Sequence, residues 1–155
     1  MIVLYEAELK GKVSSIMKRK EDILTSNVFS FFKYSNRTIF LKGFLHKGFL
    51  HKFDDIKVDD NDVKNAQFNF WPTLSDNTEP DLVIIVGDYY LLIEAKYHSD
   101  FGKATDIRKS QLNRELEEGR LEAKNLNKIF KLITITSDYY YKQYKFKNIG
   151  NKECF

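Results

Sequence analysis

The sequence is poor in cysteine and has no long apolar run, and each shortage excludes a class of protein. Cys154 is the only cysteine among 155 residues, so one chain can form neither a disulfide framework nor a cysteine-based zinc site. The longest aliphatic run, at residues 82–86, is far too short to span a bilayer. The N-terminus has no basic segment before its apolar residues and makes a poor signal peptide. We therefore expect a cytoplasmic protein with no membrane partner.

The net charge is also small. A charge of +3 permits nucleic-acid binding but does not argue for it, because many proteins without such a partner are equally basic. Hydrophobic residues make up 43% of the chain and charged residues 30%, which is typical of a globular protein, and the length suits one domain over residues 1–155.

The first part of the chain has helical spacing. In residues 21–34, Leu24, Val28 and Phe31 fall at positions i, i+4 and i+7, with Phe32 alongside, which predicts a helix with this stripe against the core. Residues 43–52 repeat Gly-Phe-Leu-His-Lys twice, with a period far below that of any solenoid. The repeat predicts a loop or a loosely helical segment, and we expect a loop or insertion over residues 43–62.

Two side-chain groups in this stretch are poor metal sites. His46 and His51 are five residues apart, a spacing that does not place them on one helix face, so solvated histidines are the better interpretation. The acidic residues 54–62 are expected to be exposed, and they lack the ligand spacing of a calcium loop.

From residue 67 the pattern changes to strands. Phe68 and Phe70 alternate with polar residues until Pro72, and strands follow at residues 81–86 and 89–96. We expect a helix over residues 105–125 and a last strand over residues 129–136, with the tail 138–155 unassigned. The helix stripe consists of Leu112, Leu116, Gly119, Ala123 and Leu126. The order α-β-β-β-α-β predicts an α/β fold, with a mixed central sheet flanked by helices.

Gly87-Asp88 is a good two-residue turn of type II′ and sets the register of the hairpin. Val86 then faces Tyr89, and counting outward places Asp81 opposite Glu94. A four-residue loop gives the same pairing, whereas a one-residue bulge would break it. Directly opposed residues have Cβ atoms roughly 4.5–5.5 Å apart, so two carboxylates share one face at the end of the hairpin.

Two carboxylates at this separation repel each other, and partial burial strengthens the repulsion. One acid can stay protonated, Lys96 on the same face can pair with one of them, or a divalent cation can bridge both. Mg²⁺ fits because it takes one or two protein carboxylates and completes its shell with water and substrate phosphate. Lys96 would then polarise the attacking water or stabilise charge on the phosphate. A purely structural salt-bridge cluster at the strand end is the alternative.

The residues that carry this chemistry resemble a known motif. Pro80-Asp81, followed by Glu94-Ala95-Lys96 on the next strand, is similar to the PD-(D/E)XK nuclease superfamily, which has the restriction-endonuclease-like fold. The order α-β-β-β-α-β is the core of that superfamily, and both halves of the motif fall on its second and third strands. The resemblance spans roughly residues 21–136.

The resemblance implies a role for each matching residue. Asp81 and Glu94 would bind the metal together with the backbone carbonyl of Ala95, and Lys96 would be the catalytic lysine. Gln111, in the helix after the motif, would orient water, lysine or phosphate, although it can equally be a plain polar helix residue. Glu21 would be an accessory ligand through water or a second metal, with a helix N-terminal acid favoured by the dipole as the alternative.

We therefore expect a Mg²⁺-dependent endonuclease, with Mn²⁺ as a substitute, that hydrolyses phosphodiester bonds of nucleic acid, DNA being the expected substrate. Specificity would be low, or a partner or a second copy, as in a homodimer, would supply it. The alternative function is a domain of the same fold that binds nucleic acid or protein without cutting. Arg108, Lys109 and Arg114 are candidates for phosphate contacts, with a solvated helix face as the alternative.

Overall fold

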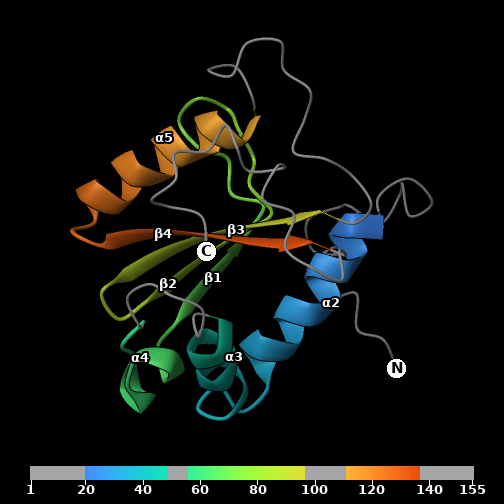
Figure 1. Cartoon of the computed structure of the whole chain (residues 1–155), viewed down its shortest axis with the longest axis vertical. Helices are drawn as coiled ribbons and strands as arrows, with labels where there is room; N and C mark the ends of the chain where they lie inside the picture. The colour runs from blue at the N-terminus through green and yellow to red at the C-terminus, as the bar shows by residue number, and fades with distance from the viewer. Residues whose placement is uncertain (1–19, 49–55, 97–110, 137–155) are drawn as a thin grey trace.

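The computed structural model describes residues 20–48, 56–96 and 111–136 of the chain. Helices precede a run of three strands, and one further helix and one strand follow (Figure 1). The elements are α2 (Lys20–Tyr34), α3 (Phe40–Gly48), α4 (Asp60–Lys64), β1 (Gln67–Phe70), β2 (Leu82–Val86), β3 (Tyr89–Lys96), α5 (Gln111–Asn125) and β4 (Ile129–Thr136).

The four strands form one mixed sheet in the order β1-β2-β3-β4. The pairs β1–β2 and β2–β3 are antiparallel, whereas β3 and β4 are parallel. A parallel pair needs a long crossover connection, and α5 lies in the connection between β3 and β4. The predicted α/β fold with a mixed sheet flanked by helices is therefore confirmed.

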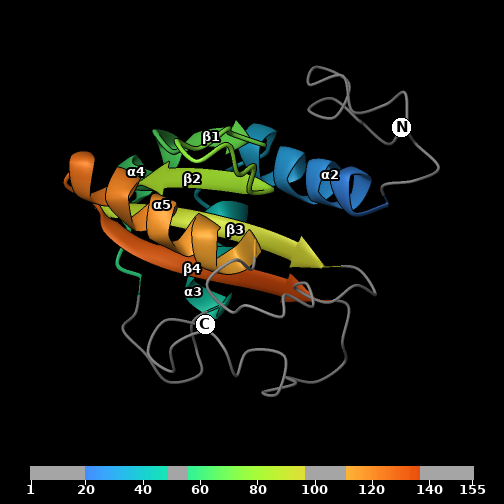
Figure 2. The same cartoon turned by 90° about the horizontal axis from the view of Figure 1, so that it is seen from above.

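Helices cover both faces of the sheet. Figures 1 and 2 show α5 on one side and α2 and α3 on the other. Alternate residues of β2 divide between the two layers, because Leu82 and Ile84 pack with α2 and α3 while Val83 packs with α5. The central strands are apolar on both faces for this reason, as the sequence predicts.

The turn between β2 and β3 has the expected conformation. Gly87 has a φ of 52°, and Asp88 is not among the described residues with positive φ, as a type II′ turn requires. The predicted register is confirmed along the whole ladder, from Val86↔Tyr89 to Leu82↔Ile93. A side chain at Gly87 would also collide with Asp62, because a Cβ there would lie 2.9 Å from its carboxyl carbon.

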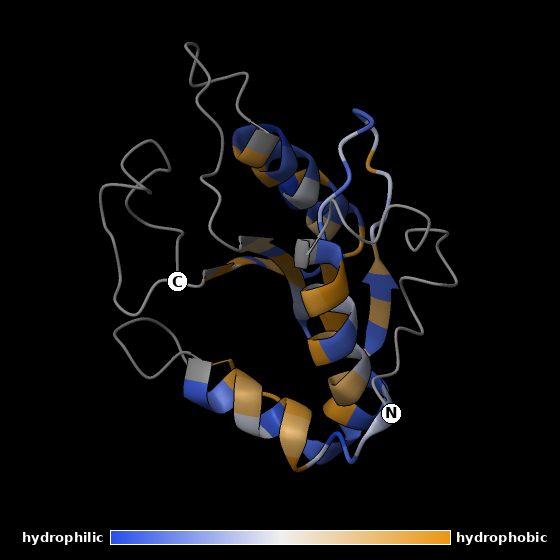
Figure 3. Ribbon diagram, turned by 90° about the vertical axis from the view of Figure 1, so that its right-hand side faces the viewer, coloured by the Kyte–Doolittle hydropathy of each residue, from blue (hydrophilic) through white to orange (hydrophobic). Residues whose placement is uncertain are grey.

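The predicted buried stripe of α2 is wrong. Leu24, Val28 and Phe31 are 45%, 40% and 50% exposed, and Figure 3, in which α2 faces the viewer, shows hydrophobic bands on its outward surface. The face that packs on the core carries Phe29, together with the buried small polar residues Thr25, Ser26 and Ser30. Phe32 does lie partly buried against the core, as expected. The helix itself begins one residue before the predicted start and ends where predicted.

The loop predicted for residues 43–62 is wrong over much of its described length. Residues 43–48 belong to α3, and residues 60–64 form α4. The apolar residues of α3 nevertheless have helical spacing. Leu41 and Leu45 are fully buried at i and i+4, and Phe44 packs beside them. His46 is exposed on α3, as expected of a solvated histidine, and His51 lies outside the described residues.

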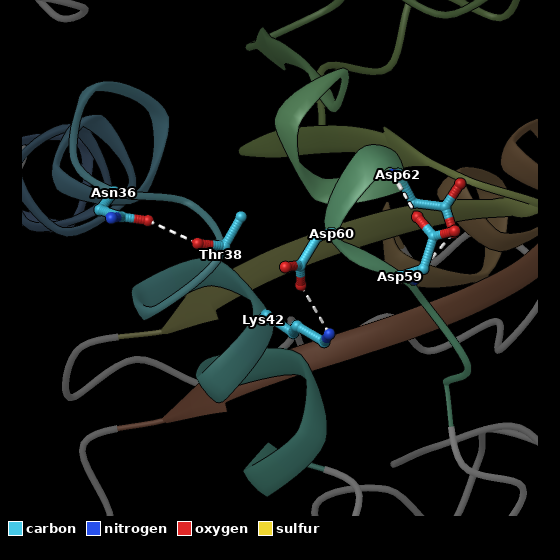
Figure 4. Close-up of polar contacts among 6 residues, drawn as sticks. All are labelled: Asn36, Thr38, Lys42, Asp59, Asp60 and Asp62. Atoms are coloured by element: carbon cyan, nitrogen blue, oxygen red, sulfur yellow. Dashed lines mark hydrogen bonds and ion pairs between the residues drawn. The ribbon is translucent and has the colours of Figure 1, made fainter.

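The acidic residues before β1 serve the ends of helices. Asp59 accepts a hydrogen bond from the Asp62 backbone N–H at 2.8 Å, and Asp62 accepts one from the Asp59 N–H at 3.0 Å (Figure 4). This reciprocal capping box starts α4. Asp60 pairs with Lys42 of α3 at 2.7 Å, and this hydrogen bond lowers the pKa of the Asp60 carboxyl. Asp59 and Asp62 thus cap α4, and Asp60 links it to α3.

Helix α5 packs closely on the sheet at Gly119. A Cβ at Gly119 would lie 2.8 Å from Leu92 Cδ1 and 2.7 Å from Phe130 Cε2, so a side chain at this position would collide with the sheet. Leu126 was expected on the same stripe, but α5 ends at Asn125 and Leu126 is 49% exposed. Residues 105–110, the tail 138–155 and Cys154 lie outside the described residues. Within the described part, no helix has the length and apolar character needed to cross a membrane.

Candidate active site at the end of the β2–β3 hairpin

Asp81 and Glu94 lie side by side just beyond the last ladder pair of β2 and β3. The Asp81 backbone N–H donates to Glu94 Oε2 at 3.4 Å, and the Ala95 N–H donates to Asp81 Oδ2 at 2.8 Å. Each carboxylate is thus held by a backbone N–H of the neighbouring strand. The structure brings these two predicted site residues together, as the turn-based register requires.

The pair sits on the side of the sheet that α5 covers. Glu94 alternates along β3 with Leu92 and Tyr90, which both belong to the cluster packed under α5. Glu94 is only 2% exposed and Asp81 is partly buried. Two carboxylates withdrawn from water repel each other, and each of these two accepts one backbone N–H hydrogen bond. A cation bound beside them would offset the repulsion.

The donor set fits Mg²⁺ better than a metal that needs a closed protein cage. Within the described ranges, no group of three or more His, Cys, Asp or Glu side chains is arranged to hold a metal ion. Asp81 and Glu94 supply two hard oxygen ligands, which is the number that Mg²⁺ ordinarily takes from a protein. Waters and phosphate oxygens of a substrate would complete the shell. The role of the Ala95 carbonyl as a third ligand stays a prediction.

Trp71 fixes Asp81 from the β1 side. Its backbone N–H donates to the Asp81 carbonyl oxygen at 3.1 Å, one step beyond the last β1–β2 pair, Phe70↔Leu82. Trp71 has a φ of 44°, a left-handed conformation that is strained for a non-glycine residue, and it is only 4% exposed. Its side chain belongs to the buried core. Nothing in the sequence signals the backbone role, because a residue before proline is ordinarily extended.

The loop that leads from β1 to Asp81 is ordered by a local turn. Asp76 Oδ1 accepts hydrogen bonds from the Thr78 N–H at 2.9 Å and from Thr78 Oγ1 at 2.6 Å. Burial acts to raise the pKa of the Asp76 carboxyl, but the Thr78 hydrogen bonds outweigh it and the net shift is downward. Arg114 of α5 approaches Asp76 Oδ2 at 3.8 Å, which links the first part of α5 to this loop.

The remaining predicted residues lie on elements that meet at this end of the sheet. Lys96 is the last residue of β3 and its backbone pairs with Thr136, while Gln111 is the first residue of α5. Glu21 is the second residue of α2, which begins at the end of the sheet where β3 and β4 finish (Figures 1 and 2). The side chains of Lys96, Gln111 and Glu21 lie outside what the structure describes, as do Arg108 and Lys109.

Sequence reasoning missed one acid near this site. Glu115 of α5 is 0% exposed, which is rare for a glutamate. The signal was present, because Glu115 falls between Leu112, Leu116 and Gly119 at helical spacing and so shares their inward face. The family resemblance points instead to Gln111, one turn earlier in the same helix.

Comparison of the chain with family models, with curated proteins and with solved structures gave no match. The chemistry of the site is therefore argued from its own residues.

Proposed function

We propose that this protein is a Mg²⁺-dependent nuclease that hydrolyses phosphodiester bonds of nucleic acid, with DNA as the preferred substrate. The observation that carries the proposal is the pair of neighbouring carboxylates, Asp81 and Glu94, which accept hydrogen bonds from the backbone N–H groups of Ala95 and Asp81 at the end of a buried hairpin. Such a pair binds a hard divalent cation, which activates water and neutralises charge that develops on a phosphate.

The neighbouring residues complete the proposal. Lys96 follows Glu94 by two positions in β3 and would stabilise the scissile phosphate or hold the attacking water. Gln111 would orient the same groups, and Glu21 would be an accessory acid. The observed order of helices and strands is the order that the resemblance to the PD-(D/E)XK superfamily implies, and it supports the proposal at the level of fold alone. A cytoplasmic location goes with it.

Cleavage assays test this function. Supercoiled plasmid, linear duplex, single-stranded DNA and RNA are incubated with the full chain and Mg²⁺ or Mn²⁺. We expect cleavage that EDTA abolishes, with a loss of about a hundredfold or more in Lys96→Ala and in Asp81→Asn. Asp88→Asn in the distant turn is the matched control and should cleave like the wild type. Absence of cleavage on all substrates with both metals would contradict the proposal.

The second candidate is a domain of the same fold that binds nucleic acid or a protein without cutting. The apolar side chains exposed on α2 favour it, since such patches often contact partners. Binding of nucleic acid without cleavage, unchanged in Lys96→Ala, would support this candidate. Under either function, a homodimer or a separate partner would supply specificity.

A further inference from the structure

Two contacts fix how α5 lies along β3. Tyr90 Oη donates to Glu122 Oε2 at 2.7 Å, and the Cβ position of Gly119 lies 2.8 Å from Leu92 Cδ1. Burial, and then the Glu122 hydrogen bond, raise the pKa of Tyr90, so its hydroxyl stays a donor. Two residues of β3 span about 6–7 Å, and three to four residues of α5 span about 4.5–6 Å in the opposite direction. Two residues along β3 and three to four residues along α5 therefore cover similar distances, so successive contacts between the two elements stay matched.

The next step along the same path reaches the site. Glu94 lies two residues beyond Leu92 in β3, and Glu115 lies four residues before Gly119 in α5. By this spacing the two acids come at the same height along the axis of β3. Both are withdrawn from water, at 2% and 0% exposure.

A second observation places this turn of α5 at the site independently. Arg114 approaches Asp76 in the loop that leads to Asp81. Leu112 and Leu116 share a buried cluster with Leu74 of the same loop. Glu115 is therefore enclosed on the side of α5 that covers the Asp81 end of the hairpin.

We propose that Glu115 is the third acidic residue of this site and a positioning residue for its cation. This inference rests on the proposed function. Because the described acids form no three-carboxyl metal group, Glu115 acts from outside the ligand shell. With a cation bound, its carboxylate would add negative charge behind Glu94 and would accept a hydrogen bond from a nearby water. Such outer groups orient ligands and raise metal affinity.

Mn²⁺ binding to the full chain, measured by electron paramagnetic resonance and calorimetry without nucleic acid, tests the role of Glu115. We expect Glu115→Gln to weaken Mn²⁺ binding about fivefold to tenfold, the effect of one unit charge roughly 7 Å from a divalent cation at a dielectric close to that of water. Glu117→Gln is the matched control, because it makes the same change at an exposed position of the same helix, away from the contacts that hold α5 on the sheet. Its Mn²⁺ affinity should stay within twofold of the wild type.

Glu115→Asp separates charge from packing. If the carboxylate is what matters, this variant retains most of the Mn²⁺ affinity that Glu115→Gln loses, even where both lower the melting temperature. Equal Mn²⁺ affinity in wild type and folded Glu115→Gln overturns the inference, as does equal weakening by Glu115→Asp and Glu115→Gln. Should the wild type bind no Mn²⁺ at all, the proposed function fails first. Binding that is lost in Asp81→Asn but unchanged in Glu115→Gln leaves the proposed function standing without the inference.

Discussion

Under the proposed function, the burial of Glu94 would serve a ligand at the expense of the fold. Its carboxylate lies near that of Asp81 and is almost fully withdrawn from water, so the two carboxylates repel each other in the metal-free protein. A glutamine has nearly the same shape and can still accept the Asp81 N–H. Active sites commonly hold such destabilising groups, and removing them stabilises the fold at the expense of activity.

We therefore expect Glu94→Gln to stabilise the metal-free protein by about 1 kcal/mol, or roughly 2–4 °C in melting temperature. Added Mg²⁺ or Mn²⁺ should stabilise the wild type by about 2.7 kcal/mol at a hundred times its Kd, and should leave Glu94→Gln unchanged. Calorimetry with and without metal measures both effects. A metal-free melting temperature that falls in Glu94→Gln would show that Glu94 is a structural acid.

Trp71 combines a strained backbone with a buried ring, and the two can be separated by substitution. Trp71→Ala should cost about 3–5 kcal/mol of unfolding free energy through the lost ring. In an ordinary helix or strand conformation, glycine gives a less stable fold than alanine. At a φ of 44°, however, glycine relieves backbone strain of about 1 kcal/mol. We expect Trp71→Gly to be as stable as Trp71→Ala or more so, as measured by urea denaturation. A glycine variant less stable than the alanine variant by about 1 kcal/mol would contradict a left-handed Trp71.

These residues show which parts of the site a sequence can reveal. Asp81 and Glu94 are paired by turn chemistry, because Gly87 fixes the register and every later residue follows by counting. Trp71 and Glu115 act through tertiary placement. The first depends on how β1 ends against β2, and the second on how α5 lies across β3. Local patterns do not predict the backbone role of Trp71. For Glu115 the helical spacing predicts an inward-facing side chain, but not its position relative to the hairpin.

At the scale of elements, α2 shows the same limit. Leu24, Val28 and Phe31 form one apolar stripe, and a second stripe through Phe29 and Phe32 lies beside it. Periodicity finds the helix but cannot choose between two apolar faces. The structure buries the face that carries Thr25, Ser26 and Ser30, whose small side chains allow the helix to approach the core closely. The strands and α5 were predicted better because each has one clear pattern.

The two faces of α2 predict unequal costs for the same substitution. Phe29 is 1% exposed, so Phe29→Ala should destabilise the fold by about 3–5 kcal/mol. Phe31 is 50% exposed and contacts the ring of Phe40, so Phe31→Ala should cost about 1 kcal/mol or less. Both free energies come from urea denaturation monitored by circular dichroism. Equal losses would mean that Phe31 is covered in solution, by another part of the chain or by a second copy.

At the scale of the whole molecule, the two ends of the hairpin have different uses. The turn end is fastened, because Lys128 Nζ donates to the Gly87 carbonyl and the Ile129 N–H donates to the Asp88 carbonyl, each at 2.7 Å. The other end carries Asp81 and Glu94, to which the proposed site adds the buried Glu115. A sheet anchored at one end and acidic at the other suits a site that must hold its geometry against charge repulsion.

The same charge distribution shapes how a nucleic acid would bind. Lys and Arg residues are spread along a chain of net charge +3, so we expect affinity to come from scattered phosphate contacts. With Ca²⁺ in place of Mg²⁺ to suppress cleavage, we expect duplex affinity to fall about a hundredfold between 50 and 200 mM salt, the loss for roughly four neutralised phosphates. Fluorescence anisotropy of a labelled duplex measures this. Asp81→Asn should retain the salt slope, because it removes a metal ligand and no phosphate contact. An affinity that does not change with salt would instead indicate recognition through base edges or apolar contacts, which a non-specific nuclease does not need.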